Sequence, residues 1–147
     1  NYRDLGEAID RTLTGNGRAL VHSIGRNRPM GPMNPWIEKR IFPGAYPPAL
    51  SEMTKIFEPF AFSIQDVENL RLHYDLTLQH WLERFDRNED AIRNQFGEAF
   101  VRAWRLYLAG SIAAFRAGTL QLFQVVFTRA TDNRLPWTRE YLYPGAA

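Results

Sequence analysis

The chain of 147 residues contains no cysteine, which excludes disulfide bonds and thiolate metal sites. Its three histidines, His22, His73 and His80, are scattered along the sequence. A tetrahedral metal site needs three or four converging ligands, and these histidines do not have the spacing that provides them. We therefore expect no metal site.

The chain also lacks a large excess of positive or negative charge and a long apolar run. The net charge is only +2, and the arginines and lysines are spread along the chain without a run or a stripe, so we expect no nucleic-acid partner. No stretch approaches the roughly 18 apolar residues of a transmembrane helix, and the first residues do not resemble a signal peptide. These features predict a cytoplasmic protein.

The chain also lacks a glycine-rich loop for binding a cofactor. No Gly-x-Gly-x-x-Gly or comparable pattern occurs in the sequence, although such a loop is what lets a backbone approach the phosphates or the sugar of a nucleotide cofactor. What the chain does have is 45% apolar and 14% aromatic residues, enough for the packed core of one domain.

The pattern along the chain alternates strands with helices. Residues 3–13 carry an apolar helical stripe that ends at the glycines around Asn16. Three segments are predicted to be strands, and they are residues 17–24, 60–70 and 120–128. This order predicts an α/β fold.

The connecting segments contain the remaining helices. Residues 25–35 have three prolines and two glycines and are expected to be a loop, followed by a short helix over 35–42. Ser51 is expected to cap a helix that ends before Pro59. After the second strand, one helix follows with Tyr74 in its first turn, and a longer one is expected over 88–117, ended by Gly118.

Several blocks, in this order, resemble cyclopropane-fatty-acyl-phospholipid synthases. The clearest are residues 18–25 (RALVHSIG), 35–44 (PWIEKRIFPG) and 68–75 (ENLRLHYD). Further similar segments are residues 41–44 with 50–53, 107–110 with 114–116, 121–127 and 135–141. The resemblance covers nearly the whole chain and implies an S-adenosylmethionine-dependent lipid methyltransferase.

For the fold, the resemblance implies the C-terminal half of a class I, Rossmann-like methyltransferase domain. The three strands would be the fifth, sixth and seventh, with the last one antiparallel between the other two. Residues 25–58 would be a substrate-side insertion, and residues 129–147 an extended tail. The first strand would then have an unpaired apolar edge, so we expect a homodimer or association through it.

In that family, the alkene attacks the sulfonium methyl, and a bound bicarbonate takes a proton as the cyclopropane ring closes. The resemblance assigns bicarbonate binding to the side chains of His22 and Tyr74 and to the backbone N–H of Ile24. The glutamate and the cysteine of the family's site, and its cofactor loop, would lie upstream of Asn1. The chain alone is therefore expected to be inactive.

The acyl chain of a membrane phospholipid is the expected substrate, bound at the inner face of the membrane. Five aromatic residues are candidates for the wall of an apolar tunnel, namely Trp36, Phe42, Tyr46, Tyr107 and Phe115. Tyr107 and Phe115 lie eight residues apart on one helical face, and aromatic faces attract a developing cation.

Simpler interpretations stay open beside these. A histidine at a strand end is often only structural, and Tyr74, Tyr107 and Phe115 fit plain helix core, while Trp36 and Phe42 fit anchors of a loop. The same scaffold can give a methyl-branched product instead of a ring. A lipid-binding or oligomerisation module without catalysis is the alternative from another class.

Overall fold

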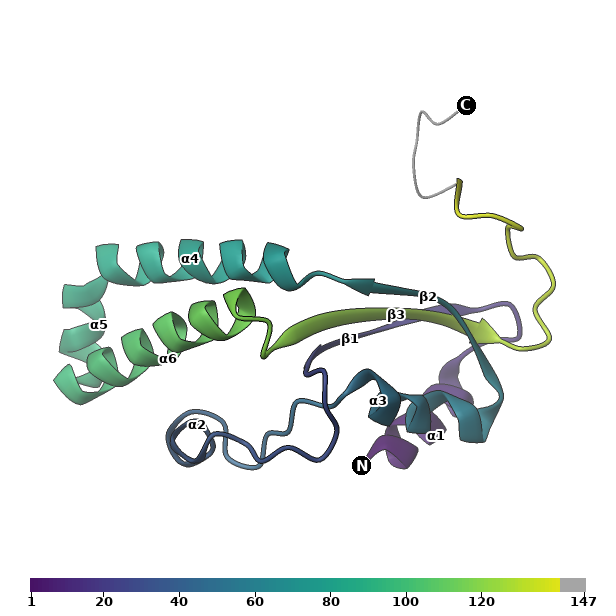
Figure 1. Cartoon of the computed structure of the whole chain (residues 1–147), viewed down its shortest axis with the longest axis horizontal. Coiled ribbons are helices and arrows are strands. Elements are labelled where there is room, and N and C mark those ends of the chain that lie inside the picture. The colour runs from purple at the N-terminus through teal and green to yellow at the C-terminus, as the bar shows by residue number, and fades with distance from the viewer. Residues whose placement is uncertain (141–147) are drawn as a thin grey trace.

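The computed structural model describes residues 1–140, which contain a three-stranded antiparallel sheet. The strands are β1 (Arg18–Gly25), β2 (Phe62–Asn69) and β3 (Gln121–Arg129), in the order β1-β3-β2. The last strand therefore lies between the other two and runs opposite to both (Figure 1). This confirms the predicted α/β class and the predicted place of the last strand.

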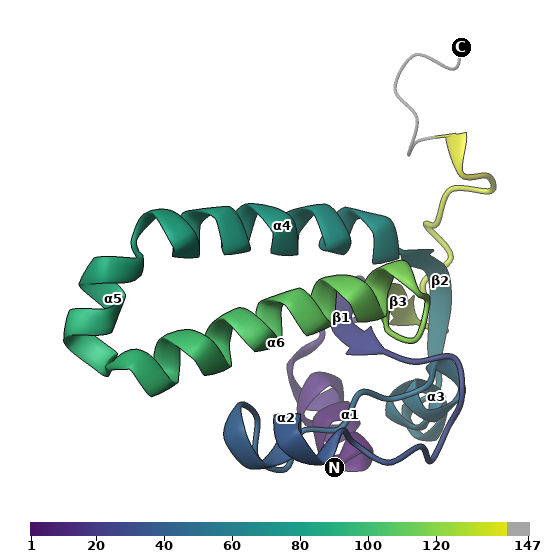
Figure 2. The same cartoon turned by 60° about the vertical axis from the view of Figure 1, so that its left-hand side comes forward.

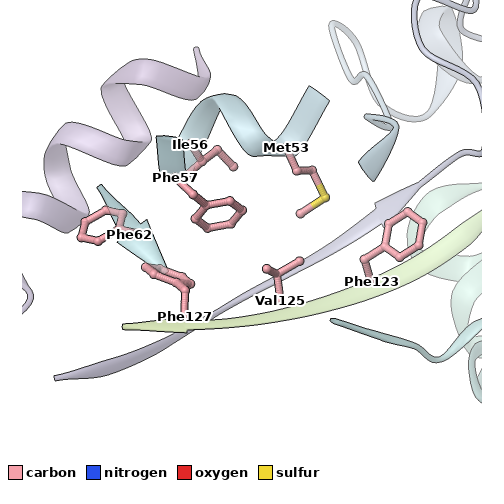
Figure 3. Packing of buried hydrophobic residues seen from close by; sticks show 7 residues of the cluster. All are labelled: Met53, Ile56, Phe57, Phe62, Phe123, Val125 and Phe127. Carbon is pink, nitrogen blue, oxygen red and sulfur yellow. The ribbon is translucent and has the colours of Figure 1, made fainter. Parts of the chain in front are cut away.

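One face of the sheet is covered by two helices, α1 (Tyr2–Thr12) and α3 (Leu50–Phe57). Alternate residues of a strand point to opposite faces, so Phe123, Val125 and Phe127 of β3 all point toward these helices. They pack with Phe62 of β2 and with three side chains of α3 (Figure 3), which are Met53, Ile56 and Phe57.

A helical hairpin continues from the end of the sheet. Its long arms, α4 (Arg71–Arg87) and α6 (Glu98–Arg116), lie side by side and antiparallel, and the short α5 (Glu89–Phe96) joins them at the far end (Figures 1 and 2). Leu78, Val101 and Leu108 are fully buried between the arms. The hairpin thus has its own core, which reaches the sheet at Leu122.

The single helix expected over 88–117 is a wrong prediction, because Gly97 divides it. Gly97 has φ 84° and ψ 164°, a conformation that is essentially restricted to glycine. Apolar periodicity continues across the break through Phe96 and Phe100, and this periodicity made the two helices look like one. Gly118, with φ 75°, follows α6 closely, as expected.

The predicted cap of α3 is also wrong. The helix begins after Ala49, and the carboxylate of Glu52 accepts the Ala49 N–H at 2.8 Å, so Ser51 lies inside the first turn. A 3₁₀ turn (Glu58–Phe60) and the left-handed Ala61 (φ 52°) delay the start of β2 to Phe62.

The short helix α2 (Pro35–Arg40) begins where it was expected, because the Asn34 side chain accepts the Trp36 and Ile37 N–H groups. It ends two residues before the expected boundary. Residues 130–139 contain no helix or strand, and the rest of the expected tail, 141–147, lies outside the described residues. No helix in the described part is long and apolar enough to cross a bilayer.

Candidate functional site

A pocket of about 960 Å³ lies between the end of β1, the segment around α2, and the adjoining parts of α4 and α6. All eight residues proposed from the sequence line it. They are His22, Ile24, Trp36, Phe42, Tyr46, Tyr74, Tyr107 and Phe115. Segments up to 93 residues apart in the chain thus form one site, since β1 supplies the first of these residues and α6 the last.

His22 lies on β1 opposite Gln124 of β3. The Gln124 amide nitrogen, Nε2, is 3.1 Å from Nδ1 of His22. Because an amide nitrogen can only donate, Nδ1 accepts this bond, and the proton of the neutral imidazole is on Nε2. Gln124 was not a candidate from the sequence, since only the strand register places it beside His22.

Tyr74 lies in the first turn of α4, with its ring against two other aromatic rings. The ring centroids are 5.0 Å from Phe115 and 5.9 Å from Trp81. Within residues 1–140, its hydroxyl has no hydrogen-bond partner. Burial raises the pKa of this phenol above its ordinary value of 10.0, so Tyr74 is a protonated donor at neutral pH.

Two interactions hold the start of α4 against the end of α6, around the Tyr74–Phe115 contact. Asp75 Oδ2 accepts a bond from Arg116 Nε at 2.9 Å. Arg71 Nη1 donates to the carbonyl oxygens of Phe115 and Arg116, at 2.6 and 3.1 Å. The Phe115 carbonyl oxygen also accepts the Gly118 N–H at 3.2 Å, so Arg71 adds to the cap of α6 while Arg116 binds α4. No sequence pattern indicated this clamp.

The segment around α2 contributes Trp36, Phe42 and Tyr46 to the pocket. The Phe42 ring meets Tyr107 edge to face at 5.4 Å. The Tyr46 hydroxyl donates to Glu52 at 2.8 Å and accepts the Met30 N–H at 2.9 Å. Tyr46 therefore faces the pocket with its ring, while its hydroxyl holds the segment in place.

Ring contacts continue from the pocket along α6. Tyr107 is 5.1 Å from Trp104, which stacks on Phe100 at 5.7 Å, and Phe100 is 4.8 Å from Phe96. Phe100, Trp104 and Tyr107 recur every three or four positions, which places them on one face of α6, whereas Phe96 is the last residue of α5. The row of rings thus leads from Tyr107 in the pocket toward the far end of the hairpin.

The donor set of the pocket suits a small anion and an apolar chain. Among the described lining residues there is no aspartate or glutamate, and His22, Tyr74 and Arg26 provide polar hydrogens. The residues do not fit an S-adenosylmethionine site, because neither β1 nor β2 leads into a glycine-rich turn and helix. In the described part, no three metal-binding side chains come together.

The family model of mycolic acid cyclopropane synthetase matches residues 1–125. The chain is 37% identical over 135 residues to the cyclopropane-fatty-acyl-phospholipid synthase of Escherichia coli K12, which covers 92% of this chain and 35% of that protein. It is 41% identical over 96 residues to a tuberculostearic acid methyltransferase of Mycobacterium tuberculosis, covering 64% and 22%. The chain thus spans about a third or less of these relatives.

Solved structures of other proteins contain the same fold as this chain. The cyclopropane synthase MmaA2 from Mycobacterium tuberculosis superposes with a TM-score of 0.79 at 21% identity, over 87% of this chain and 50% of that one. A mycolic acid cyclopropane synthase complexed with SAH and CTAB gives 0.79 at 23% identity, with the same coverage. The predicted class I methyltransferase fold is thereby confirmed. With its family model matched over most of its length, the chain belongs to the mycolic acid cyclopropane synthetase family.

Proposed function

We propose that this chain is the acceptor-side part of an S-adenosylmethionine-dependent lipid methyltransferase. The complete protein adds a methylene group to the double bond of an unsaturated fatty acyl chain of a phospholipid and forms a cyclopropane ring. It works as a peripheral protein at the inner face of the membrane. The observation that carries the proposal is the convergence of His22, Tyr74 and the aromatic residues in one pocket.

The apolar walls hold the acyl chain and exclude water. Phe42, Tyr107 and Phe115 lie around this space, and their ring faces attract a cation that develops on the substrate. Exclusion of water matters, because a carbocation in a wet site is captured by the solvent.

Bicarbonate fits the polar end of the pocket. The His22 Nε2 proton and the Tyr74 hydroxyl are both donors, and no carboxylate lines the described pocket to repel an anion. When bound, bicarbonate supplies the base that accepts the proton released in ring closure. His22, Tyr74 and the Ile24 N–H orient it, and the raised pKa of Tyr74 keeps that hydroxyl a donor.

The methyl donor needs residues beyond this chain, so we propose that the chain alone is inactive. The direct test compares this chain with a version extended at its N-terminus by the remainder of the gene product. Each is incubated with S-adenosylmethionine and vesicles of unsaturated phospholipid, and the fatty acids are analysed by mass spectrometry. Proton NMR then distinguishes a ring from an alkene.

We expect one added methylene, as a cyclopropane, only with the extended chain. No conversion by a folded, donor-binding extended chain would contradict the proposed function. Conversion by the short chain would contradict its inactivity.

The Tyr74→Phe variant of the extended chain tests the role of the hydroxyl. Loss of one donor to a reacting group lowers kcat by about 100-fold. The free energy of unfolding should change by less than about 1 kcal/mol, because the hydroxyl has no partner in the described residues. Tyr2→Phe, on α1 and outside the pocket, is the matched control. A large stability loss with unchanged kcat would make Tyr74 a core residue.

A methyl-branched product is a second candidate. It is favoured by the relatives named tuberculostearic acid methyltransferase and, in Candida albicans, sphingolipid C9-methyltransferase, the latter 34% identical over 92 residues. The NMR spectrum of the product decides between a ring and a branch. A lipid-binding module without catalysis would retain acyl chains in the pocket and convert none.

A further inference from the structure

We infer that Arg26 binds the phosphate of a lipid headgroup while the apolar chain of the same lipid lies in the pocket. This inference deepens the proposed function and rests on it for the chain's position. It makes Arg26 a specificity-determining residue that selects a phosphate-bearing amphiphile.

Arg26 continues the row of pocket residues on β1. His22 and Ile24 are separated by one residue, and Arg26 follows directly after the last residue of the strand at the same spacing. Alternate residues of an extended chain share a face, and all three line the pocket. The cation is therefore placed at the end of the pocket wall that begins at His22.

The charge of Arg26 is not neutralised. It is the single permanently charged side chain among the described residues of the pocket wall. Within residues 1–140 it takes part in no ion pair, unlike Arg11, Arg93, Arg102, Arg105 and Arg116 of the helices. A half-buried cation without a carboxylate favours an anionic ligand.

The guanidinium is held in a fixed orientation. Nε donates to the Pro47 carbonyl oxygen at 2.7 Å, and Nη1 donates to the Gly31 carbonyl oxygen at 2.5 Å and to that of Pro32 at 3.3 Å. Its carbon lies 4.8 Å from the centre of the Tyr46 ring. Neutral carbonyls fix the direction of the group without cancelling its charge.

The loop is shaped around this side chain. A side chain at Gly31 would collide with Nη1, so glycine permits the close approach. The second terminal nitrogen, Nη2, has no acceptor among the described residues and is the one available to a ligand. A guanidinium held in this way suits a phosphate, whose oxygens it meets as a planar fork.

The distance along β1 agrees with a lipid that spans the pocket. Four residues of extended strand separate His22 from Arg26, or about 13 Å of backbone. A reacting bond near His22 and a headgroup at Arg26 are therefore separated by a long section of chain. A free small anion cannot use both ends at once, whereas an extended amphiphile can.

The experiment measures binding to this chain by isothermal titration calorimetry. The probes are dodecyl phosphate and dodecyltrimethylammonium, which share one alkyl chain and differ in charge, each below its critical micelle concentration. We expect tighter binding of the phosphate. Arg26→Gln should weaken that binding roughly tenfold, the effect of one charge-assisted hydrogen bond, and leave the ammonium probe unaffected.

Two further variants separate the charge of Arg26 from the general charge of the loop. Arg28→Gln removes an exposed arginine of the same loop that does not line the pocket, and it should keep the preference for phosphate. Arg26→Lys should retain part of it. Circular dichroism confirms that each variant is folded.

The inference is overturned if Arg26→Gln keeps the preference for the phosphate probe, or if Arg28→Gln loses as much of that preference as Arg26→Gln. It is also overturned if inorganic phosphate or bicarbonate binds to Arg26 as tightly as dodecyl phosphate, because the alkyl chain would then contribute nothing. The assay contains no methyl donor. Binding without lipid conversion by the extended chain therefore refutes the proposed function alone, and conversion without phosphate preference refutes the role of Arg26 alone.

Discussion

His22 and Gln124 are 102 residues apart in the sequence, and the pairing of β1 with β3 brings their side chains within 3.1 Å. The bond from Gln124 decides which imidazole nitrogen carries the proton. Gln124 is not among the described lining residues of the pocket, yet its bond controls the direction in which His22 offers its hydrogen.

The Gln124→Leu variant of the extended chain should lower kcat by up to about tenfold, the worth of one neutral hydrogen bond, with little change in KM. Gln65→Leu is the matched control, since Gln65 lies on β2, bonds to Ser63 and Thr128, and does not line the pocket. The measurement is the pair of steady-state constants. An equal effect of both variants would indicate general loss of stability rather than orientation of His22.

The raised pKa values of two tyrosines predict how the stability of the protein responds to alkaline pH. Burial raises the pKa of Tyr74 and of Tyr107 above 10.0, so the folded chain holds these protons more tightly than the unfolded chain. This contribution to stability is fully present below pH 10.0 and is lost as the pH rises through the folded pKa values. Urea unfolding across this range should show the decline.

Tyr107→Phe should make that decline shallower, because one group with a raised pKa is removed. A decline of the same steepness in this variant would show that other groups cause it. Tyrosinate absorbance during the titration identifies the range in which the native phenols ionise.

At the scale of elements, Gly97 is the residue at which the chain changes direction between α5 and α6. Its N–H donates to the Arg93 carbonyl oxygen at 2.8 Å, so one residue ends a helix and precedes the next. The change of direction there is what lets Glu89 and Asp86 meet Arg105 of α6.

Gly97→Ala should lower the free energy of unfolding by about 1–3 kcal/mol, because alanine is strained at this φ and ψ. Gly110→Ala is the matched control, since Gly110 lies within α6 and a Cβ there meets nothing within 4 Å. That change should raise stability by about 0.5–1 kcal/mol. Both are measured by urea unfolding, and a stabilising Gly97→Ala would contradict the account of the break.

The sequence predicted elements better than their ends. Apolar periodicity located the strands and α4, because burial on one face leaves a regular pattern. It could not reveal Gly97, since a break of one residue leaves the spacing of Phe96 and Phe100 intact. The role of Glu52 at the start of α3 was not predicted, because Ser51 was expected to cap the helix. Instead, the Glu52 carboxylate, which lies inside the first turn, accepts the Ala49 N–H.

The candidate site, like the fold, could be predicted only in part. The residues of the family blocks could be named from the sequence, and the structure brings them together. The supporting contacts of Gln124, Asp75 and Arg26 could not be predicted from the sequence. They depend on strand register, on the packing of two helix ends and on backbone carbonyls of an irregular loop.

At the scale of the whole molecule, β1 is an edge strand. Among residues 1–140 its ladder partner is β3 alone, and Leu20 is half exposed on it. An open apolar edge is a site for pairing with another chain. We therefore predict that this chain dimerises or forms larger assemblies at micromolar concentration.

Leu20→Lys should shift the population to monomer, because a charge on an edge strand opposes pairing. Val67→Lys, on the opposite edge strand β2, is the matched control and should leave the assembly unchanged. Sedimentation velocity measures both. A monomeric unmodified chain at these concentrations would contradict the prediction.

The place of β3 also sets the order in which the molecule can be made. β1 and β2 are not paired with each other, and each pairs only with residues 121–129 in the described part. On the ribosome, the helices can form as they emerge, but no two strands of this sheet can pair until its last strand has left the exit tunnel. If synthesis stops before Gln121, the described part of the polypeptide has two strands that are not paired with each other, which makes it a substrate for chaperones and proteases.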